Sequence, residues 1–190
     1  MSTSKIPVHK CLERLQWLLG VWRSETASIH LEGKAFSYQS ELTCEHVGQP
    51  NFILHINAFN VQPLSNENIN SSWTNANELK PFHREMGFLR VNPKDENVNE
   101  ISYLNVQNVG LANVEEGNLQ EKSFQVETKA IGRSCFNKDP SVRYLRREYR
   151  LDENDSNFLH VKVYMATSKM NSNEQPFEHL TIRYRKVSND

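Results

Sequence analysis

The sequence offers little for disulfide bonds, metal crosslinks or membrane anchoring. Cysteine is scarce: Cys11, Cys44 and Cys135 are widely spaced, odd in number and include no CxxC pair. This spacing argues against a disulfide framework and against a cysteine-based zinc site. The longest apolar stretch, around Leu15 to Trp22, is much too short to span a bilayer, and the N-terminus has no signal-like apolar region. We therefore expect a cytoplasmic protein with reduced cysteines.

An excess of charge of either sign is also missing. The formal net charge is −1, and acidic and basic residues are interspersed along the chain. Proteins that bind nucleic acid or membranes usually carry a basic patch, so we expect neither as a partner. The 190 residues fit one domain that can bury a core without disulfides or metals.

Motifs of common enzyme classes are absent as well. No serine or cysteine nucleophile has a recognisable partner pattern, no glycine-rich phosphate loop follows a strand, and no HExxH or DxDxG ligand set occurs. Hydrolase and nucleotide-binding functions are therefore poorly supported, and no catalytic side chain is predicted.

A short amphipathic helix is predicted over residues 9 to 19, where Leu12, Leu15 and Leu18 recur at helical spacing. Gly20 is consistent with the end of this helix. A first strand should begin at 21–23, with Trp22 packed beneath the helix.

The remaining pattern is almost entirely β. Further strands are predicted at 41–47, 52–58, 83–91, 101–107, 111–114, 124–131, 143–151, 158–167 and 177–187. Turns are predicted at 48–50, 92–95, 115–118 and 152–157, and a long Asn/Ser-rich connection at 63–81 interrupts the rhythm. Many short strands with tight turns indicate an up-and-down barrel or a sandwich.

One histidine, His179, stands where a polar loop becomes the last strand. A neutral imidazole in such a place can serve as a metal or heme axial ligand, and it can equally be an ordinary solvated histidine. In a regular strand His179 would share a face with Thr181 and Arg183, opposite Leu180 and Ile182.

Another candidate pair, His83 and Glu85, shares one strand face and could point into a barrel cavity. The alternative is that Met86 and Phe88 line the interior and the polar pair faces water. The alternation does not decide between them.

Several ordered motifs are similar to those of one family. They are Trp17-Leu-Leu-Gly-Val-Trp22, Phe36-Ser-Tyr38 with Glu41, His46-Val-Gly-Gln-Pro50, His83-Arg-Glu-Met-Gly-Phe-Leu-Arg90, Gln107-Asn-Val-Gly110, Val114-Glu-Glu-Gly117, Met165-Ala-Thr167 and Gln175-Pro-Phe-Glu-His179. In this order they resemble the nitrobindin family, heme-binding β-barrels that also form the C-terminal domain of THAP-type proteins.

The resemblance implies an all-β fold: a ten-stranded antiparallel up-and-down barrel of the calycin type, related in shape to fatty-acid-binding proteins, with a short N-terminal helix. It covers one domain, residues 9–190, after a tail at 1–8.

It also implies ferric heme b as cofactor and His179 as the ligand of the iron. The other expected cofactor-binding positions are His83, Gln107, Met165 and Phe82. The implied activity is isomerisation of peroxynitrite to nitrate, with nitric oxide binding as a related property and with the heme iron as the only catalytic centre. A homodimer is left open.

The chain departs from the family before Phe36, where a segment ending in Tyr-Pro-Thr is expected. Glu32 falls at the heme-contacting threonine, and His30 at the tyrosine. A carboxylate near a porphyrin is costly if it is buried and unpaired. The rival hypothesis is therefore a heme-free barrel that binds a fatty-acid-like or other apolar small molecule.

Overall fold

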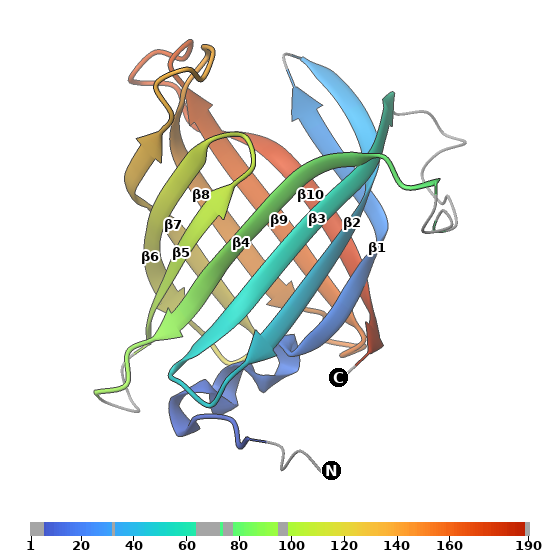
Figure 1. The fold of residues 1–190 in the computed structure, drawn as a ribbon, viewed down its shortest axis with the longest axis vertical. Coiled ribbons are helices and arrows are strands. Elements are labelled where there is room, and N and C mark those ends of the chain that lie inside the picture. The colour runs from blue at the N-terminus through green and yellow to red at the C-terminus, as the bar shows by residue number, and fades with distance from the viewer. Residues whose placement is uncertain (1–5, 32, 64–72, 74–77, 95–98, 189–190) are drawn as a thin grey trace.

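The protein is a closed barrel of ten antiparallel strands in which each strand pairs with its neighbours in sequence and the first pairs with the last (Figure 1). A computed structural model of the chain describes residues 6–31, 33–63, 73, 78–94 and 99–188. A helix, η1 (Lys10–Leu18), precedes the strands. The strands are β1 (Gly20–Leu31), β2 (Lys34–His46), β3 (Asn51–Pro63), β4 (Pro81–Val91), β5 (Glu100–Gln107), β6 (Leu111–Leu119), β7 (Ser123–Arg133), β8 (Val142–Leu151), β9 (Phe158–Thr167) and β10 (Phe177–Ser188). The predicted fold is confirmed.

Helix η1 closes one end of the barrel. It is a 3₁₀ helix, and its three leucines at positions 12, 15 and 18 are fully buried. The indole N–H of Trp22 donates to the carbonyl of Leu18 at 2.8 Å, so the first strand is bound directly to the end of the helix. Trp22 therefore packs beneath the helix as expected. Within the described ranges, no helix has the length and apolar character of a membrane span.

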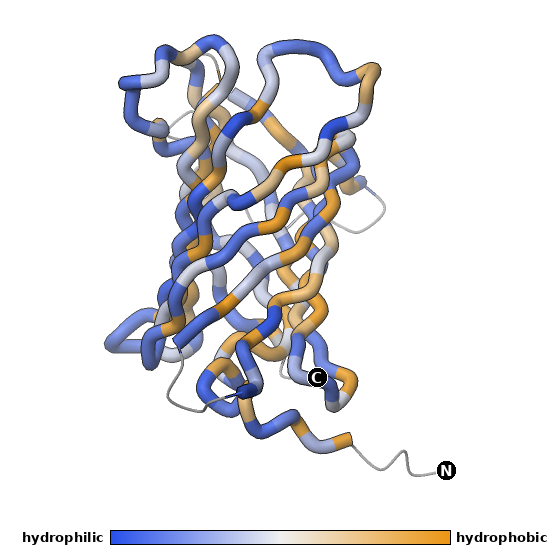
Figure 2. Tube along the Cα trace, turned by 90° about the vertical axis from the view of Figure 1, so that its left-hand side faces the viewer, coloured by the Kyte–Doolittle hydropathy of each residue, from blue (hydrophilic) through white to orange (hydrophobic). Residues whose placement is uncertain are grey.

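Side chains alternate along the strands between the barrel interior and the surface, and the hydropathy of the residues changes along the chain (Figure 2). In β4 the inward face carries Glu85 and Leu89, both buried. Met86 and Phe88 are 47% and 51% exposed on the opposite face. The alternative in which these two apolar residues line the interior is therefore wrong.

The turn predicted at 115–118 is also wrong, because β6 continues to Leu119 and the chain reverses over 120–122. Gly117 is needed here for a close approach between strands. A Cβ at this position would lie 1.9 Å from the carbonyl oxygen of Gln125 on β7. The glycine allows the two strands to approach closely at this position.

Because the strands run alternately up and down, their starts and ends are divided between the two ends of the barrel. Odd-numbered strands end, and even-numbered strands begin, at the end of the barrel opposite η1 (Figure 1). The start of β4, the end of β5 and the start of β10 therefore meet there. Most of the long connection predicted at 63–81 lies outside the described residues, but Trp73 donates its indole N–H to the carbonyl of Ser24 on β1 at 3.0 Å.

We expect Gly117→Ala to destabilise the barrel by about 1–3 kcal/mol or more, because backbone rather than a flexible side chain would have to move. Gly132→Ala on β7 is the matched control, since its Cβ would meet only ordinary contacts at 3.9 Å. The control should stay within about 1 kcal/mol of the wild type. Urea unfolding measures both, and equal free energies of unfolding would contradict the close-approach account.

Candidate functional site

His179 is placed by a β-bulge at the start of β10. The register with β9 shifts between Glu178, which pairs with Tyr164, and Leu180, which pairs with Val163. His179 is the extra residue between them. A bulge breaks the two-residue alternation of side chains, so the phase expected for a regular strand does not apply here.

The imidazole at the bulge is partly buried. Leu180 packs against the core, and the charges that act on His179 include those of the interior residues His83 and Arg147. Its ring also lies edge-on to that of Phe177, with 5.9 Å between the ring centres. The phase that would place His179 with Thr181 assumed a regular strand, and that condition is not met here.

One ring nitrogen of His179 is held by the neighbouring strand. Nδ1 lies 2.9 Å from the backbone carbonyl oxygen of His30, near the end of β1. A carbonyl can only accept, so Nδ1 carries the proton and Nε2 carries the free lone pair. This is the arrangement in which a histidine coordinates a metal through Nε2 while a second partner fixes its orientation.

The environment of His179 keeps the imidazole neutral. Burial lowers its pKa from 6.5 to about 4; the hydrogen bond to His30 opposes this shift, and the charges of His83 and Arg147 add to it. A metal ligand must be deprotonated. At neutral pH this imidazole needs no further loss of a proton before it can coordinate.

The other predicted pocket residues lie around the same end of the barrel. Met165, at the end of β9, pairs with Phe177 and packs half-buried against the core. Phe82 is left unpaired by a register shift between β3 and β4 and is 40% exposed. Glu32 lies outside the described residues, so the expectation for it stays a prediction.

His83 and Gln107 contact a polar cluster inside the barrel. His83 Nε2 lies 3.9 Å from Glu85 Oε2, and Gln107 Nε2 donates to Asn105 Oδ1 at 3.5 Å. Glu85 and Gln107 face each other across the β4–β5 pair. Two of the residues expected from the resemblance are thus connected to buried polar partners.

Sequence reasoning missed the centre of this cluster, Arg147. Its guanidinium is buried and binds Glu85 and Glu115, each at 2.9 Å. The signal was present, because Arg147 shares its strand face with Leu145 and Tyr149. A cation on an apolar strand face indicates a buried ion pair. Glu115 was missed because it was assigned to a turn.

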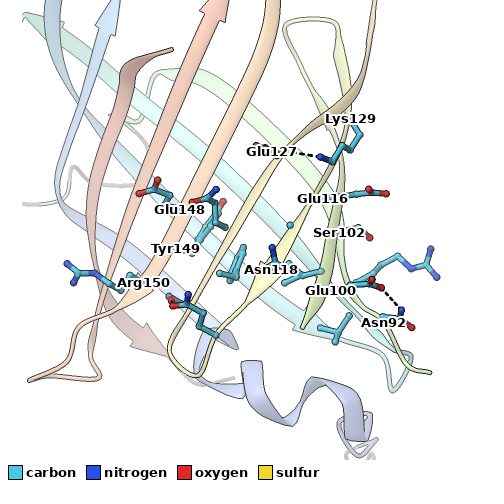
Figure 3. Close-up of a pocket in the computed structure, with 18 of the residues that line it drawn as sticks. Asn92, Glu100, Ser102, Glu116, Asn118, Glu127, Lys129, Glu148, Tyr149 and Arg150 are labelled. Carbon is cyan, nitrogen blue, oxygen red and sulfur yellow. Dashed lines mark hydrogen bonds and ion pairs between the residues drawn. The ribbon is translucent and has the colours of Figure 1, made fainter. Parts of the chain in front are cut away.

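A large open hollow of about 1230 Å³ lies elsewhere, along β4 to β9 (Figure 3). Outward-facing charged residues such as Glu116, Glu127 and Lys129 line it, and the last two pair with each other at 2.9 Å. Neither His179 nor His83 contributes to it. A water-exposed groove lined by charged side chains is poorly suited to an apolar porphyrin, so the end of the barrel that carries His179 is the better candidate site.

The lowered pKa of His179 predicts a pH-dependent stability. The folded state disfavours the proton that the unfolded chain binds near pH 6.5, so the stabilisation is present above that pH and is lost as the pH falls toward 4. The loss should reach roughly 3 kcal/mol. His179→Asn keeps an N–H donor without the titrating ring, so the stability difference between the two proteins should change by this amount in urea unfolding between pH 7.5 and 4. A difference that does not vary with pH would contradict the assignment.

Comparisons with known proteins identify the family of the chain. The model of the THAP4-like, heme-binding beta-barrel domain matches residues 11–186. Peroxynitrite isomerase THAP4 of Rattus norvegicus is 33% identical over 184 residues, which cover 95% of this chain and 28% of that protein. The Homo sapiens protein of the same name is 31% identical over 193 residues, which cover 99% of this chain and 29% of that protein. The chain thus spans less than a third of these relatives.

A solved structure shares the fold. The crystal structure of Rv2717c from M. tuberculosis matches with a TM-score of 0.70 at 20% identity, covering 96% of this chain and all of the other. The family follows from the match over residues 11–186: the chain belongs to the THAP4-like, heme-binding β-barrel domains.

Proposed function

We propose that the barrel binds ferric heme b through Nε2 of His179 and isomerises peroxynitrite to nitrate, with nitric oxide as a related ligand. The observation that carries the proposal is the Nδ1 hydrogen bond to the His30 carbonyl, which leaves Nε2 as the coordinating nitrogen of a neutral imidazole. This bond uses backbone, so it persists although the side chains of this segment differ from those expected for the family.

One imidazole is a sufficient contribution from the protein when a porphyrin supplies four nitrogens. Within the described part of the chain, no group of three or more His, Cys, Asp or Glu side chains could hold a bare metal ion. Met165 and Phe177 offer apolar surface beside the histidine, as an apolar macrocycle requires.

Bound heme would supply the iron that converts peroxynitrite to its isomer nitrate, without net uptake of protons or electrons. The chain therefore needs no dedicated acid–base pair. Its own residues hold the imidazole in one orientation, exclude water with apolar side chains, and present His83 and Gln107 toward the end of the barrel where a ligand enters.

The rival function, a carrier of a fatty-acid-like molecule, is less well supported. A fatty-acid carboxylate inside a barrel needs a cation, and Arg147 is already bound by two carboxylates of the protein. An additional carboxylate would meet Glu85 and Glu115 in a buried environment, where like charges repel strongly. A neutral apolar molecule would avoid this repulsion, and identification of co-purified ligands by mass spectrometry would detect it.

We expect titration of the protein with ferric heme to give a saturable, shifted Soret band. His179→Ala should weaken binding by at least about 100-fold, more than the loss of an outer-shell partner typically does. His160→Ala is the matched control, because His160 is bound to Asp152 and contributes to the outer hollow instead. Equal binding by the wild type and His179→Ala would refute the assignment of the ligand.

The activity is tested separately by mixing peroxynitrite with the heme-loaded protein and measuring nitrate yield and decay rate. We expect faster decay and more nitrate than with free buffer or the heme-free protein. If heme binds through His179 and neither quantity changes, the binding assignment stands and the isomerase proposal fails.

A further inference from the structure

Arg147 joins strands that are not neighbours in the barrel. It comes from β8, whose hydrogen-bonded neighbours are β7 and β9. Its Nη2 donates to Glu85 on β4 at 2.9 Å, and its Nε donates to both carboxylate oxygens of Glu115 on β6, at 3.1 and 2.9 Å. Arg147 has only 4% of its surface exposed. Its guanidinium therefore links β4, β6 and β8 through the interior of the barrel.

The first arm from Arg147 runs through Glu85 to His83. One oxygen of Glu85 accepts from the hydroxyl of Tyr103 at 2.8 Å. The other binds Arg147 and lies 3.9 Å from Nε2 of His83. An ionised carboxylate only accepts, so it favours the His83 tautomer with the proton on Nε2.

The second arm runs through Glu115 to Gln107. Glu115 Oε1 accepts from the amide of Asn105 at 3.3 Å, and Asn105 Oδ1 accepts from Gln107 at 3.5 Å and from Asn113 at 3.0 Å. The two polar residues expected in the pocket, on adjacent strands, therefore both connect to one guanidinium.

The pKa values of the two carboxyl groups in the cluster shift in opposite directions. Burial would raise the pKa of Glu85, but the charge of Arg147 and the contacts with His83 and Tyr103 outweigh burial and hold it below its usual value. Burial raises the pKa of Glu115, with Arg147 opposing and the charge of Glu85 adding. Arg147 thus keeps Glu85 ionised beside His83.

Stability alone does not account for such a cluster, since well-packed apolar replacements for a buried ionic triad are often as stable. We propose that Arg147 is a positioning residue that acts through Glu85 and Glu115 to fix the orientation of His83 and Gln107 at the ligand-binding end of the barrel. The inference rests on the proposed function for the identity of the ligand, whereas the positioning itself can be measured without heme.

The central experiment uses the triple variant Glu85→Gln/Glu115→Gln/Arg147→Met, which replaces all three charged side chains of the cluster by uncharged ones and leaves His179 in place. In the heme-free wild type, nitrogen-15 NMR of the histidine rings should show His83 in the Nε2–H tautomer, with His83→Asn assigning the signals. The triple variant should show a mixture of tautomers and a shifted Gln107 side-chain amide. A folded triple variant with unchanged His83 and Gln107 signals would overturn the proposal.

Single isosteric substitutions test the contacts through Glu85 and through Glu115 separately. They disturb the core less than the triple variant, so they can be used if that variant does not fold. Each leaves one carboxylate paired with Arg147. Glu85→Gln should alter only the His83 ring, and Glu115→Gln only the Gln107 amide. Glu25→Gln is the matched control, because Glu25 also bridges two cationic groups, Arg183 and Arg185, but on the outer face. Changes at His83 or Gln107 that are equal in all three variants would overturn the proposal.

The heme-loaded proteins provide the second readout. With azide as a small anionic probe, the affinity of the triple variant should change between about 2- and 30-fold, while heme affinity stays near that of the wild type. Unchanged azide affinity in a folded triple variant would count against positioning. If the wild type binds no heme through His179, the proposed function fails, and the NMR result still decides the role of Arg147.

Discussion

The pairing of the first strand with the last is the constraint on which the rest of the molecule depends. It closes the sheet, so that every strand has a hydrogen-bonded neighbour on each side, and it joins segments about 150 residues apart. The same pairing brings the end of β1 beside the start of β10. Without it the carbonyl of His30 would not reach the ring of His179, and the imidazole would be neither oriented nor half-buried.

Closure alone does not set the phase of the side chains at the start of β10, where one inserted residue breaks the alternation. The bulge between Glu178 and Leu180 shifts the side-chain phase at the point where the strand begins. Its position at the strand end matters, because a bulge further along would shift the core residues Ile182 and Tyr184 as well. The site thus departs from regular β geometry while the core below it keeps its alternation. Bulges near functional sites commonly have this role.

Much of the fold could be predicted from the sequence because alternation and turn residues are local signals. They indicated η1, Trp22 beneath it, and most of the strands. Gly117 was misread because the close approach of a neighbouring strand leaves no trace in local composition. The site was less accessible: a two-residue period cannot represent the bulge at His179, and the partners of Arg147 lie 62 and 32 residues away and depend on register. Only the family resemblance singled out His179 strongly.

The division of connections between the two ends has a consequence for how such a barrel can diversify. At the end closed by η1, packing against the buried leucines restricts the chain. The opposite end is not covered by η1, and a longer connection from an odd-numbered strand to the next would leave the order of the strands unchanged. Lengthening the segment before β10, for example, alters what stands beside His179 but not which residues pair below it. Ligand preference can therefore drift in evolution largely independently of folding stability.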